Sequence, residues 1–254
     1  MCGRFYLHTL PEHIVAQFEI VGLPDKTLDP ESIKGNPERE RAASALGPRY
    51  NIAPGQHIAV VRRRRGDTEL AAPRWGLIPF WSNDDSMAYK TINARSETAH
   101  EKPAFRDAFA KRRCLVPADG FYEWKQGPAG KQPLAVSVEN ERGRPAVYAM
   151  AGLWETWRDP SIDADLETAT ILTCAANPAL AEIHPRMPVI LPREAWTAWL
   201  DERTSIDDAR RLCTPYTASA MPSRPVSTRV NSVRNDDPSL LDDAIDESKG
   251  LFGM

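Results

Sequence analysis

The chain has 254 residues, of which 42% are hydrophobic and 26% are charged, and its formal net charge at pH 7 is −3. This length supports a sizeable buried core, and the composition is that of an ordinary globular protein. The acidic balance excludes a protein that coats nucleic acid by bulk charge, although it allows a local basic groove. Because no apolar run approaches the length of a membrane span and no signal-peptide core is evident, we expect a cytoplasmic protein with no membrane partner.

The predicted elements, in chain order, are short strands interrupted by short helices. Thr9 and Glu12 form a capping-box pattern that predicts a first helix, and the charged, proline-rich residues 24–50 indicate an exposed insertion. A short apolar run, 58–61, predicts a strand that ends in the basic hairpin tip 62–67. The later sequence predicts helices at 103–111, 178–183, 192–200 and 207–212, and strands at 114–116, 120–125, 134–138, 145–154, 169–175 and 226–230.

This order of elements shows no regular strand–helix alternation, which favours an α+β fold over a doubly wound one. We expect a single domain over residues 2–235, built on a curved, barrel-like and mainly antiparallel sheet with short flanking helices. Residues 236–254 begin with a run of acidic side chains and are predicted to form a tail with the composition of a disordered segment.

Four cysteines occur, at positions 2, 114, 174 and 213. They show no C-x-x-C spacing and no neighbouring His pair, so we expect neither a metal site nor a cofactor. A disulfide framework is not expected in a reducing cytosol. Cys114 and Cys174 lie in apolar stretches and are predicted to fill buried strands, which leaves Cys2 as the cysteine whose position suggests chemistry.

The start of the chain, Met1-Cys2-Gly3-Arg4-Phe5, is the most informative stretch. An initiator Met before a small side chain is normally removed, so methionine aminopeptidase is an expected partner and Cys2 the expected mature N-terminus. Cys2 would then carry an α-amine that titrates near neutrality and a thiol on the adjacent carbon. Two nucleophiles on one residue indicate covalent chemistry, although these five residues alone are also compatible with chance.

Three polar sites lie in apolar or turn-rich surroundings. Asn93 and Arg95 are two apart, so on a strand they share one face. Glu123 lies in an aromatic strand, where burial would raise its pKa toward the range of a proton shuttle. His184 lies in a rigid double-proline segment. Each also has an ordinary interpretation: a turn cap for Asn93, an arginine pair for Glu123 and a carbonyl hydrogen bond for His184.

Aromatic residues interleaved with arginines are the other unusual feature. Such a pattern suits single-stranded nucleic acid, in which aromatic rings stack on bases and guanidinium groups hold phosphates. It also suits a protein core. We expect Trp75, Trp124 and Trp154 to lie mostly in the core, and Phe80 and Trp81 to lie on the surface because a polar loop follows them.

Taken together, six ordered motifs resemble the SOS response-associated peptidase (SRAP) family, whose members sense abasic sites in single-stranded DNA. The resemblance runs from residue 2 to about 235 and includes Val230-Asn231-Ser232-Val233-Arg234. The motifs are Met1-Cys2-Gly3-Arg4-Phe5, Tyr50-Asn51-Ile52-Ala53-Pro54, Trp75-Gly76-Leu77-Ile78-Pro79-Phe80-Trp81, Asn93-Ala94-Arg95-Ser96-Glu97-Thr98, Pro117-Ala118-Asp119-Gly120-Phe121-Tyr122-Glu123-Trp124 and His184-Pro185-Arg186-Met187-Pro188-Val189-Ile190-Leu191.

The resemblance implies a DNA–protein cross-linking, lyase-type activity. An abasic deoxyribose exposes an aldehyde, to which the amine of Cys2 adds to form an imine before the thiol closes a thiazolidine ring. Closure is favoured because the amine and the thiol are on neighbouring carbons. By the same resemblance, Glu123 is the acid/base carboxylate, His184 assists sugar-ring opening, and Asn93 holds the N-terminus and the sugar.

The resemblance also implies a DNA-binding surface. The expected phosphate contacts are Arg4, Arg95 and Arg186, whose guanidinium groups suit bidentate bonding to a bent backbone. The expected stacking or wedging residues are Phe80 and Trp81. Phe80 departs from the aromatic that the family often has there, which puts stacking strength in doubt. Pro54 and Thr173 are expected to line the pocket.

Two rival classes remain open on the sequence. An N-terminal-nucleophile amidohydrolase also begins with a mature Cys, whose thiol attacks an amide. A non-catalytic single-strand binder would keep its DNA affinity without Cys2. The family name also records a proposed autopeptidase, which a Cys-Glu-His grouping could support. We expect a monomer whose partner is single-stranded DNA with an abasic site, acting in the cytoplasm and on the nucleoid after damage.

Overall fold

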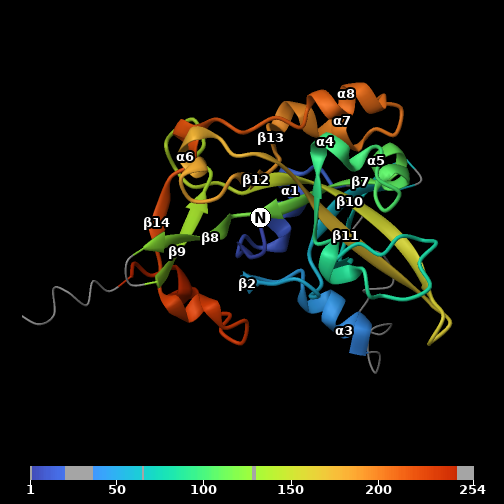
Figure 1. Cartoon of the computed structure of the whole chain (residues 1–254), viewed down its shortest axis with the longest axis horizontal. Helices are drawn as coiled ribbons and strands as arrows, with labels where there is room; N and C mark the ends of the chain where they lie inside the picture. The colour runs from blue at the N-terminus through green and yellow to red at the C-terminus, as the bar shows by residue number, and fades with distance from the viewer. Residues whose placement is uncertain (1, 21–36, 65, 128–129, 245–254) are drawn as a thin grey trace, which may run out of the picture.

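The computed structural model describes residues 2–20, 37–64, 66–127 and 130–244, and its strands form two sheets (Figure 1). The first sheet has the order β14 (Ser223–Pro225), β9 (Gly130–Ser137), β8 (Gly120–Gly127), β1 (Phe5–Leu7) and β2 (Arg49–Ile52). Each neighbouring pair in it is antiparallel.

The second sheet is larger and contains the longest strands. Its main path is β12 (Arg186–Pro188), β11 (Ala164–Ala175), β10 (Tyr148–Asp159), β7 (Arg113–Ala118), β3 (Val60–Arg64) and β4 (Asp67–Ala71). Outside this path, β13 (Ile190–Leu191) pairs with β10, and both β5 (Arg74–Trp75) and β6 (Asn93–Arg95) pair in parallel with β11.

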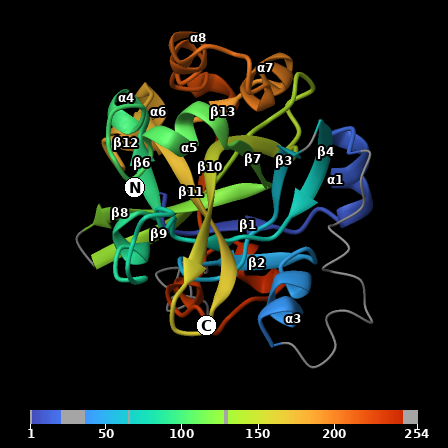
Figure 2. The same ribbon diagram turned by 90° about the vertical axis from the view of Figure 1, so that its right-hand side faces the viewer.

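Short helices surround the sheets, and the view in Figure 2 places α7 and α8 at one end of the molecule and α3 at the other. The α-helices are α1 (Pro11–Gln17), α3 (Pro37–Ser44), α4 (Ser96–Ala99), α5 (Arg106–Lys111), α6 (Pro178–Ala181), α7 (Trp196–Leu200) and α8 (Ile206–Arg211). The 3₁₀ helices are η2 (Ala88–Lys90), η3 (Arg193–Ala195), η4 (Ala218–Ala220), η5 (Thr228–Asn231) and η6 (Pro238–Leu241).

The core forms where β7, β10 and β11 run side by side. These strands are buried on both faces: β7 is buried along its whole length, and the aligned stretch from Tyr148 to Trp154 of β10 is buried too. Phe5 of β1 contacts Trp75 edge-to-face, with ring centroids 5.3 Å apart. Burial of these side chains removes a large apolar area from water. It also fixes β1, and with it the N-terminal residues, against both sheets.

The predicted fold class is confirmed: the chain is α+β, and its sheets are mainly antiparallel. The strands divide between two open sheets in the described residues, so the barrel-like description holds only loosely. Apart from the strand predicted at 226–230, the expected elements appear near their predicted places, with β10 and β11 longer than predicted. Cys114 and Cys174 are buried strand residues, as expected.

Four local expectations are corrected. The strand predicted at 226–230 is wrong, because Ser227 caps the 3₁₀ helix η5 there; Val226 lies just before this helix, Val230 lies within it, and both are buried. The packed chain continues past the predicted boundary at 235, since η6 buries Leu240. Of the predicted insertion 24–50, residues 24–36 lie outside the described residues. The rest contains α3 and β2, and Ala45 is buried.

The fourth correction concerns the basic hairpin tip. The β3–β4 hairpin exists, but Arg62 is fully buried instead of solvated. Its guanidinium lies 4.2 Å from the Trp154 ring centroid and pairs with Glu69 at 2.7 Å and Glu167 at 2.9 Å. Two carboxylates and an aromatic face compensate for the desolvation of this cation.

Candidate active site around Cys2

The first strand positions Cys2. In β1, Phe5 lies opposite Phe121 of β8, so the residues before Phe5 run alongside the segment that contains Glu123. Cys2 is fully buried, and its carbonyl accepts a hydrogen bond of 2.8 Å from Nδ2 of Asn93. The thiol is one of four free cysteines. The N-terminal residue is therefore held between β8 and β6.

Glu123 and His184 lie within electrostatic reach of Cys2. Burial raises the pKa of the Cys2 thiol, and the nearby Glu123 carboxylate raises it further. Burial likewise raises the pKa of Glu123, while the charge of His184 opposes that shift. Because both acids are pushed toward their neutral forms, the pair is suited to holding and moving protons.

His184 follows α6 and precedes β12. Both the N–H and the carbonyl oxygen of Arg186 lie 3.0 Å from its Nδ1. These contacts fix the ring whichever nitrogen carries the proton. The structure thus brings together the four predicted catalytic residues: Cys2 and Asn93 in direct contact, with Glu123 and His184 interacting electrostatically.

The edge of the second sheet groups several of the predicted DNA contacts. Arg95 of β6 is aligned with Thr173 of β11, and Arg186 of β12 is aligned with Ala175. Arg186 donates bidentately to the Glu97 carboxylate at 2.6 and 2.8 Å and also to the Thr173 carbonyl at 2.5 Å. These hydrogen bonds lower the pKa of Glu97. Arg95 is exposed beside this clamp, whereas Thr173 is fully buried.

Arg4 is half-buried and makes contacts within the protein. Its Nη1 donates to Asn51 Oδ1 at 2.7 Å and to the Val230 carbonyl at 2.8 Å, and its guanidinium lies 5.9 Å from the Trp124 ring centroid. Burial lowers its pKa. Asn51 was not singled out from the sequence, although it lies in one of the six motifs. Its full burial and its several hydrogen bonds make it a positioning residue.

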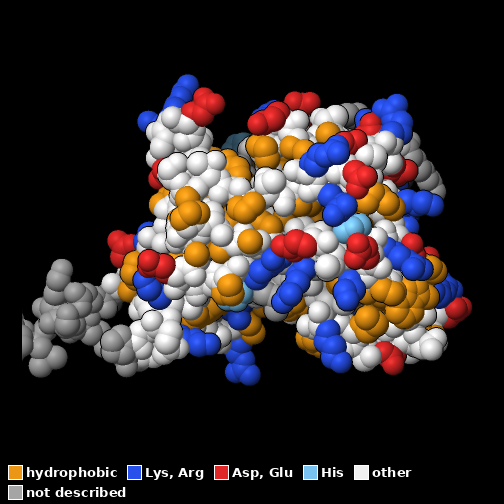
Figure 3. Space-filling view, turned by 45° about the horizontal axis from the view of Figure 1, so that its top comes forward, with side chains coloured by type: hydrophobic (Ala, Val, Ile, Leu, Met, Phe, Trp, Pro, Cys, Tyr) orange, Lys and Arg blue, Asp and Glu red, His pale blue; other side chains and the backbone are white. Residues whose placement is uncertain are grey.

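The aromatic residues divide largely as expected, except that Trp124 is only partly buried, and there is one addition. Phe80 and Trp81 are 55% and 48% exposed, whereas Trp75 is fully buried. Tyr89 of η2, which the sequence analysis did not single out, is 77% exposed. Pro54 is half-buried at the turn after β2. The face in Figure 3 carries several Lys and Arg side chains near its centre, interspersed with acidic ones.

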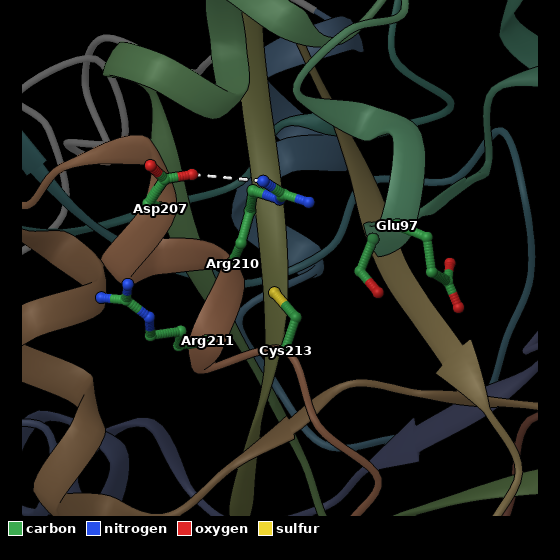
Figure 4. Close-up of a pocket in the computed structure, with 6 residues that line it drawn as sticks. Glu97, Asp207, Arg210, Arg211 and Cys213 are labelled. Atoms are coloured by element: carbon green, nitrogen blue, oxygen red, sulfur yellow. Dashed lines mark hydrogen bonds and ion pairs between the residues drawn. The ribbon is translucent and has the colours of Figure 1, made fainter.

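A pocket of about 430 Å³ opens beside the Arg186–Glu97 clamp, between α4 and α8. Figure 4 shows Glu97 on one side and the ion pair of Asp207 and Arg210, 3.2 Å apart, on the other. Its lining residues are Ser96, Glu97, Asp207, Arg210, Arg211 and Cys213. Within the described part of the chain there is no group of three or more His, Cys, Asp or Glu side chains that could hold a metal ion.

Comparison with known proteins identifies the family. The sequence model of the family described as "SOS response associated peptidase (SRAP)" matches residues 1–233. The chain belongs to this family.

The matches to relatives of this SRAP protein cover between 76% and 95% of its length. It is 39% identical over 244 residues to "Abasic site processing protein YoqW" of Bacillus subtilis (strain 168), which covers 95% of this chain and 99% of that protein. It is 36% identical over 222 residues to "Abasic site processing protein HMCES" of Gallus gallus, covering 76% and 66%. A crystal structure of a protein from Bacteroides thetaiotaomicron has a TM-score of 0.80, with 25% identity over 96% and 100% of the two chains. The resemblance read from the sequence and the SRAP-like fold are thus confirmed.

No helix among the residues described in the structure combines the length and the apolar character needed to span a membrane.

Proposed function

We propose that this SRAP protein processes abasic sites in single-stranded DNA by forming a covalent thiazolidine through Cys2. The observation that carries the proposal is the grouping of a buried Cys2 with Asn93, Glu123 and His184. The printed names of the relatives, which are abasic site processing proteins, support the choice of substrate. Removal of Met1 by methionine aminopeptidase is the condition for activity, because only then does Cys2 carry the amine.

The proposed reaction balances as a condensation. The amine of Cys2 attacks the aldehyde carbon of the ring-opened deoxyribose, and loss of one water gives an imine. The thiol then adds to the imine carbon, and its proton passes to the nitrogen as the five-membered ring closes. Glu123 accepts a proton from the amine and returns one to the departing hydroxyl, while His184 supplies a proton for ring opening of the sugar.

The raised pKa of the thiol sets the order of these steps. Because burial and Glu123 keep the Cys2 sulfur protonated, the amine reacts first and the thiol adds only once an imine is next to it.

DNA binding is assigned to the surface around this site. We propose that Arg95 and Arg186 contact phosphates and that Arg4 supports the site through Asn51 while reaching the strand. Phe80 and Trp81 stack beside the lesion, and Pro54 and Thr173 line the sugar pocket. The cross-link shields the lesion in the response to DNA damage. The protein acts as a monomer in the cytoplasm, at the nucleoid, and light scattering of the purified protein checks the first point.

The deciding experiment incubates protein whose Met1 has been removed, as verified by mass spectrometry, with a single-stranded oligonucleotide that carries one abasic site. We expect a heat-stable adduct without any reductant. Cys2→Ala retains the α-amine, so it should give an adduct only when borohydride reduces the imine. Cys114→Ala is the matched control and should react like the wild type. A heat-stable, reductant-free adduct with Cys2→Ala, or none with the wild type, excludes the thiazolidine.

A further inference from the structure

A second cavity, of about 530 Å³, lies on the other side of the turn that contains Pro54. It is framed by α3, β2 and residues 55–57, and Figures 1 and 2 both show α3 beside β2. Its lining residues are Arg41, Ser44, Arg49, Gly55, Gln56, His57, Arg74 and Asp236. None of these residues belongs to the proposed catalytic group or to the expected phosphate contacts.

The cavity is built around fixed cations. Arg49 is held by Asp236, with Nε 2.5 Å from Oδ2, and by Gln56, with Nη2 2.8 Å from Oε1. Asp236 is also occupied through Oδ1, which accepts the backbone N–H groups of Tyr50 and Asn51. The lining therefore contains three guanidinium groups and one carboxylate, so most of its charged side chains are cationic.

Arg74 supplies the least satisfied of these cations. Its Nη2 lies 3.3 Å from Asp85, whose side chain is 61% exposed, while its own side chain is only 24% exposed. The Nε of Arg74 is buried and has no hydrogen-bond partner among the described residues. A buried donor without an acceptor is costly. Because Arg74 lines the cavity, an anion bound there would add a charge-assisted partner for its guanidinium.

The cavity adjoins both an exposed ring and the candidate site. Gly55 has φ of +83°, and a Cβ there would lie 3.9 Å from both Cε1 and Oη of Tyr89, so the exposed Tyr89 ring sits at the rim. Asn51 accepts a hydrogen bond from Arg4 and donates its backbone N–H to Asp236. Asn51 of β2 therefore connects Arg4, which is close to Cys2 in the sequence, with the cavity.

We propose that this cavity is a second subsite for single-stranded DNA, which holds a phosphodiester on Arg74 and Arg49 and stacks a base on Tyr89. The class of ligand rests on the proposed function, whereas the positive cavity and its aromatic rim do not. Arginine forks suit phosphate oxygens, and an aromatic ring next to a basic groove is the usual means of binding a single strand without sequence preference. The subsite would hold the strand on the Pro54 side of the lesion.

The test measures binding of an undamaged oligonucleotide by fluorescence anisotropy, with salt varied. Arg74→Gln should bind a long single strand about fivefold more weakly, and its slope of log affinity against log salt should be smaller by about 0.7. Tyr89→Ala should bind the same long strand about tenfold more weakly. Arg203→Gln, an exposed arginine that pairs with Asp201, is the matched control and should bind like the wild type.

Two further arms separate this subsite from the reactive one. An oligonucleotide too short to leave the lesion pocket should bind Arg74→Gln and wild type equally. A mononucleotide should not displace the long strand, because one phosphate lacks the stacking and the second contact. The final adduct yield at saturating abasic DNA should be the same in Arg74→Gln as in the wild type. Unchanged affinity and salt slope in a folded Arg74→Gln overturn the subsite, whereas loss of adduct in the wild type overturns the proposed function.

Discussion

At the scale of single residues, the environment of Cys2 raises the pKa values of two neighbouring acids. The thiol and the Glu123 carboxyl are both buried, and for each of them burial is the largest cause of a raised pKa. A charged Glu123 further disfavours the thiolate. The site therefore places a carboxyl group of raised pKa next to a nucleophile, an arrangement suited to a condensation in which one water must leave.

Glu123→Gln should make the free protein more stable at neutral pH. Because burial raises the folded-state pKa of Glu123 above its unfolded value, the stability that the neutral carboxyl contributes is complete below the unfolded pKa. It is lost as the pH rises through the folded pKa, while glutamine never ionises. In urea unfolding, Glu123→Gln should have a larger free energy of unfolding than the wild type at pH 7. This gap in stability should close near pH 4. A gap that grows toward acid pH would contradict the burial of this carboxyl.

Tyr148→Phe should leave stability unchanged or raise it by about 1 kcal/mol. The Tyr148 hydroxyl is buried without a hydrogen-bond partner in the described part of the chain, and such a group costs free energy when folded. Tyr122→Phe is the matched control, because the Tyr122 hydroxyl donates to the Tyr50 carbonyl at 2.8 Å. The control should lose about 1 kcal/mol in the same urea titration. Equal losses in the two variants would indicate that Tyr148 is also satisfied.

At this scale the sequence was most informative where a motif fixes chemistry and least where a partner is far away in the chain. Cys2, Asn93, Glu123 and His184 were recognised from their motifs, and they do lie together. Arg4 was read only as a phosphate contact, because its observed partner, the Val230 carbonyl, is 226 residues away. Composition and periodicity carry no information about such a pairing.

At the scale of elements, a glycine positions the loop that presents the exposed aromatics. Gly76 follows β5, has φ of +125°, and donates its N–H to the Ala169 carbonyl at 2.8 Å. A Cβ at this position would lie 2.5 Å from the Ala88 carbonyl oxygen at the start of η2. Only glycine permits both this backbone conformation and this close approach.

Gly76→Ala should therefore destabilise the fold by about 2 kcal/mol or more, since backbone strain and a steric clash add. Gly143→Ala is the matched control, because Gly143 also has a positive φ, of +65°, but has open space around its missing Cβ. It should cost about 1 kcal/mol. Thermal unfolding of the two variants gives the comparison, and equal shifts in Tm would show that the contact with Ala88 does not constrain η2.

The elements also show which local signals were sufficient. The long apolar stretches of β10 and β11 were predicted because consecutive residues in them are apolar, which a local window of sequence reveals. The parallel strands β5 and β6 have two and three residues, too few for any periodicity, and they exist because β11 offers them an edge. The strand predicted at 226–230 failed for a different reason: two β-branched valines suggested a strand, but both are buried by a capped 3₁₀ turn instead.

At the scale of the whole molecule, the end of the chain closes the structure around its beginning. The segment 226–244, which we name the C-terminal strap, accepts hydrogen bonds from Arg4 and Asn51 at the carbonyls of Val230, Ser232 and Asn235. The predicted boundary at 235 cuts through this strap. It was placed there because an acidic composition is typical of a disordered tail, and composition does not reveal that a carboxylate has partners in the fold. Asp236 has three such partners: Arg49, Tyr50 and Asn51.

Shortening the chain within the strap should therefore weaken both the fold and the reaction. A chain that ends at Asn235 loses the charge-assisted hydrogen bonds of Asp236 and the burial of Leu240, which are worth about 1.5–3 kcal/mol each. The entropy of ordering the strap offsets part of that sum, so we expect a net loss of about 2 kcal/mol or more relative to a chain that ends at Ala244. Asn51 would then hold Arg4 less firmly, and adduct formation should slow before the final yield falls. If both chains unfold at the same urea concentration and react at the same rate, the strap does not support the site and Arg4 is positioned by β1 alone.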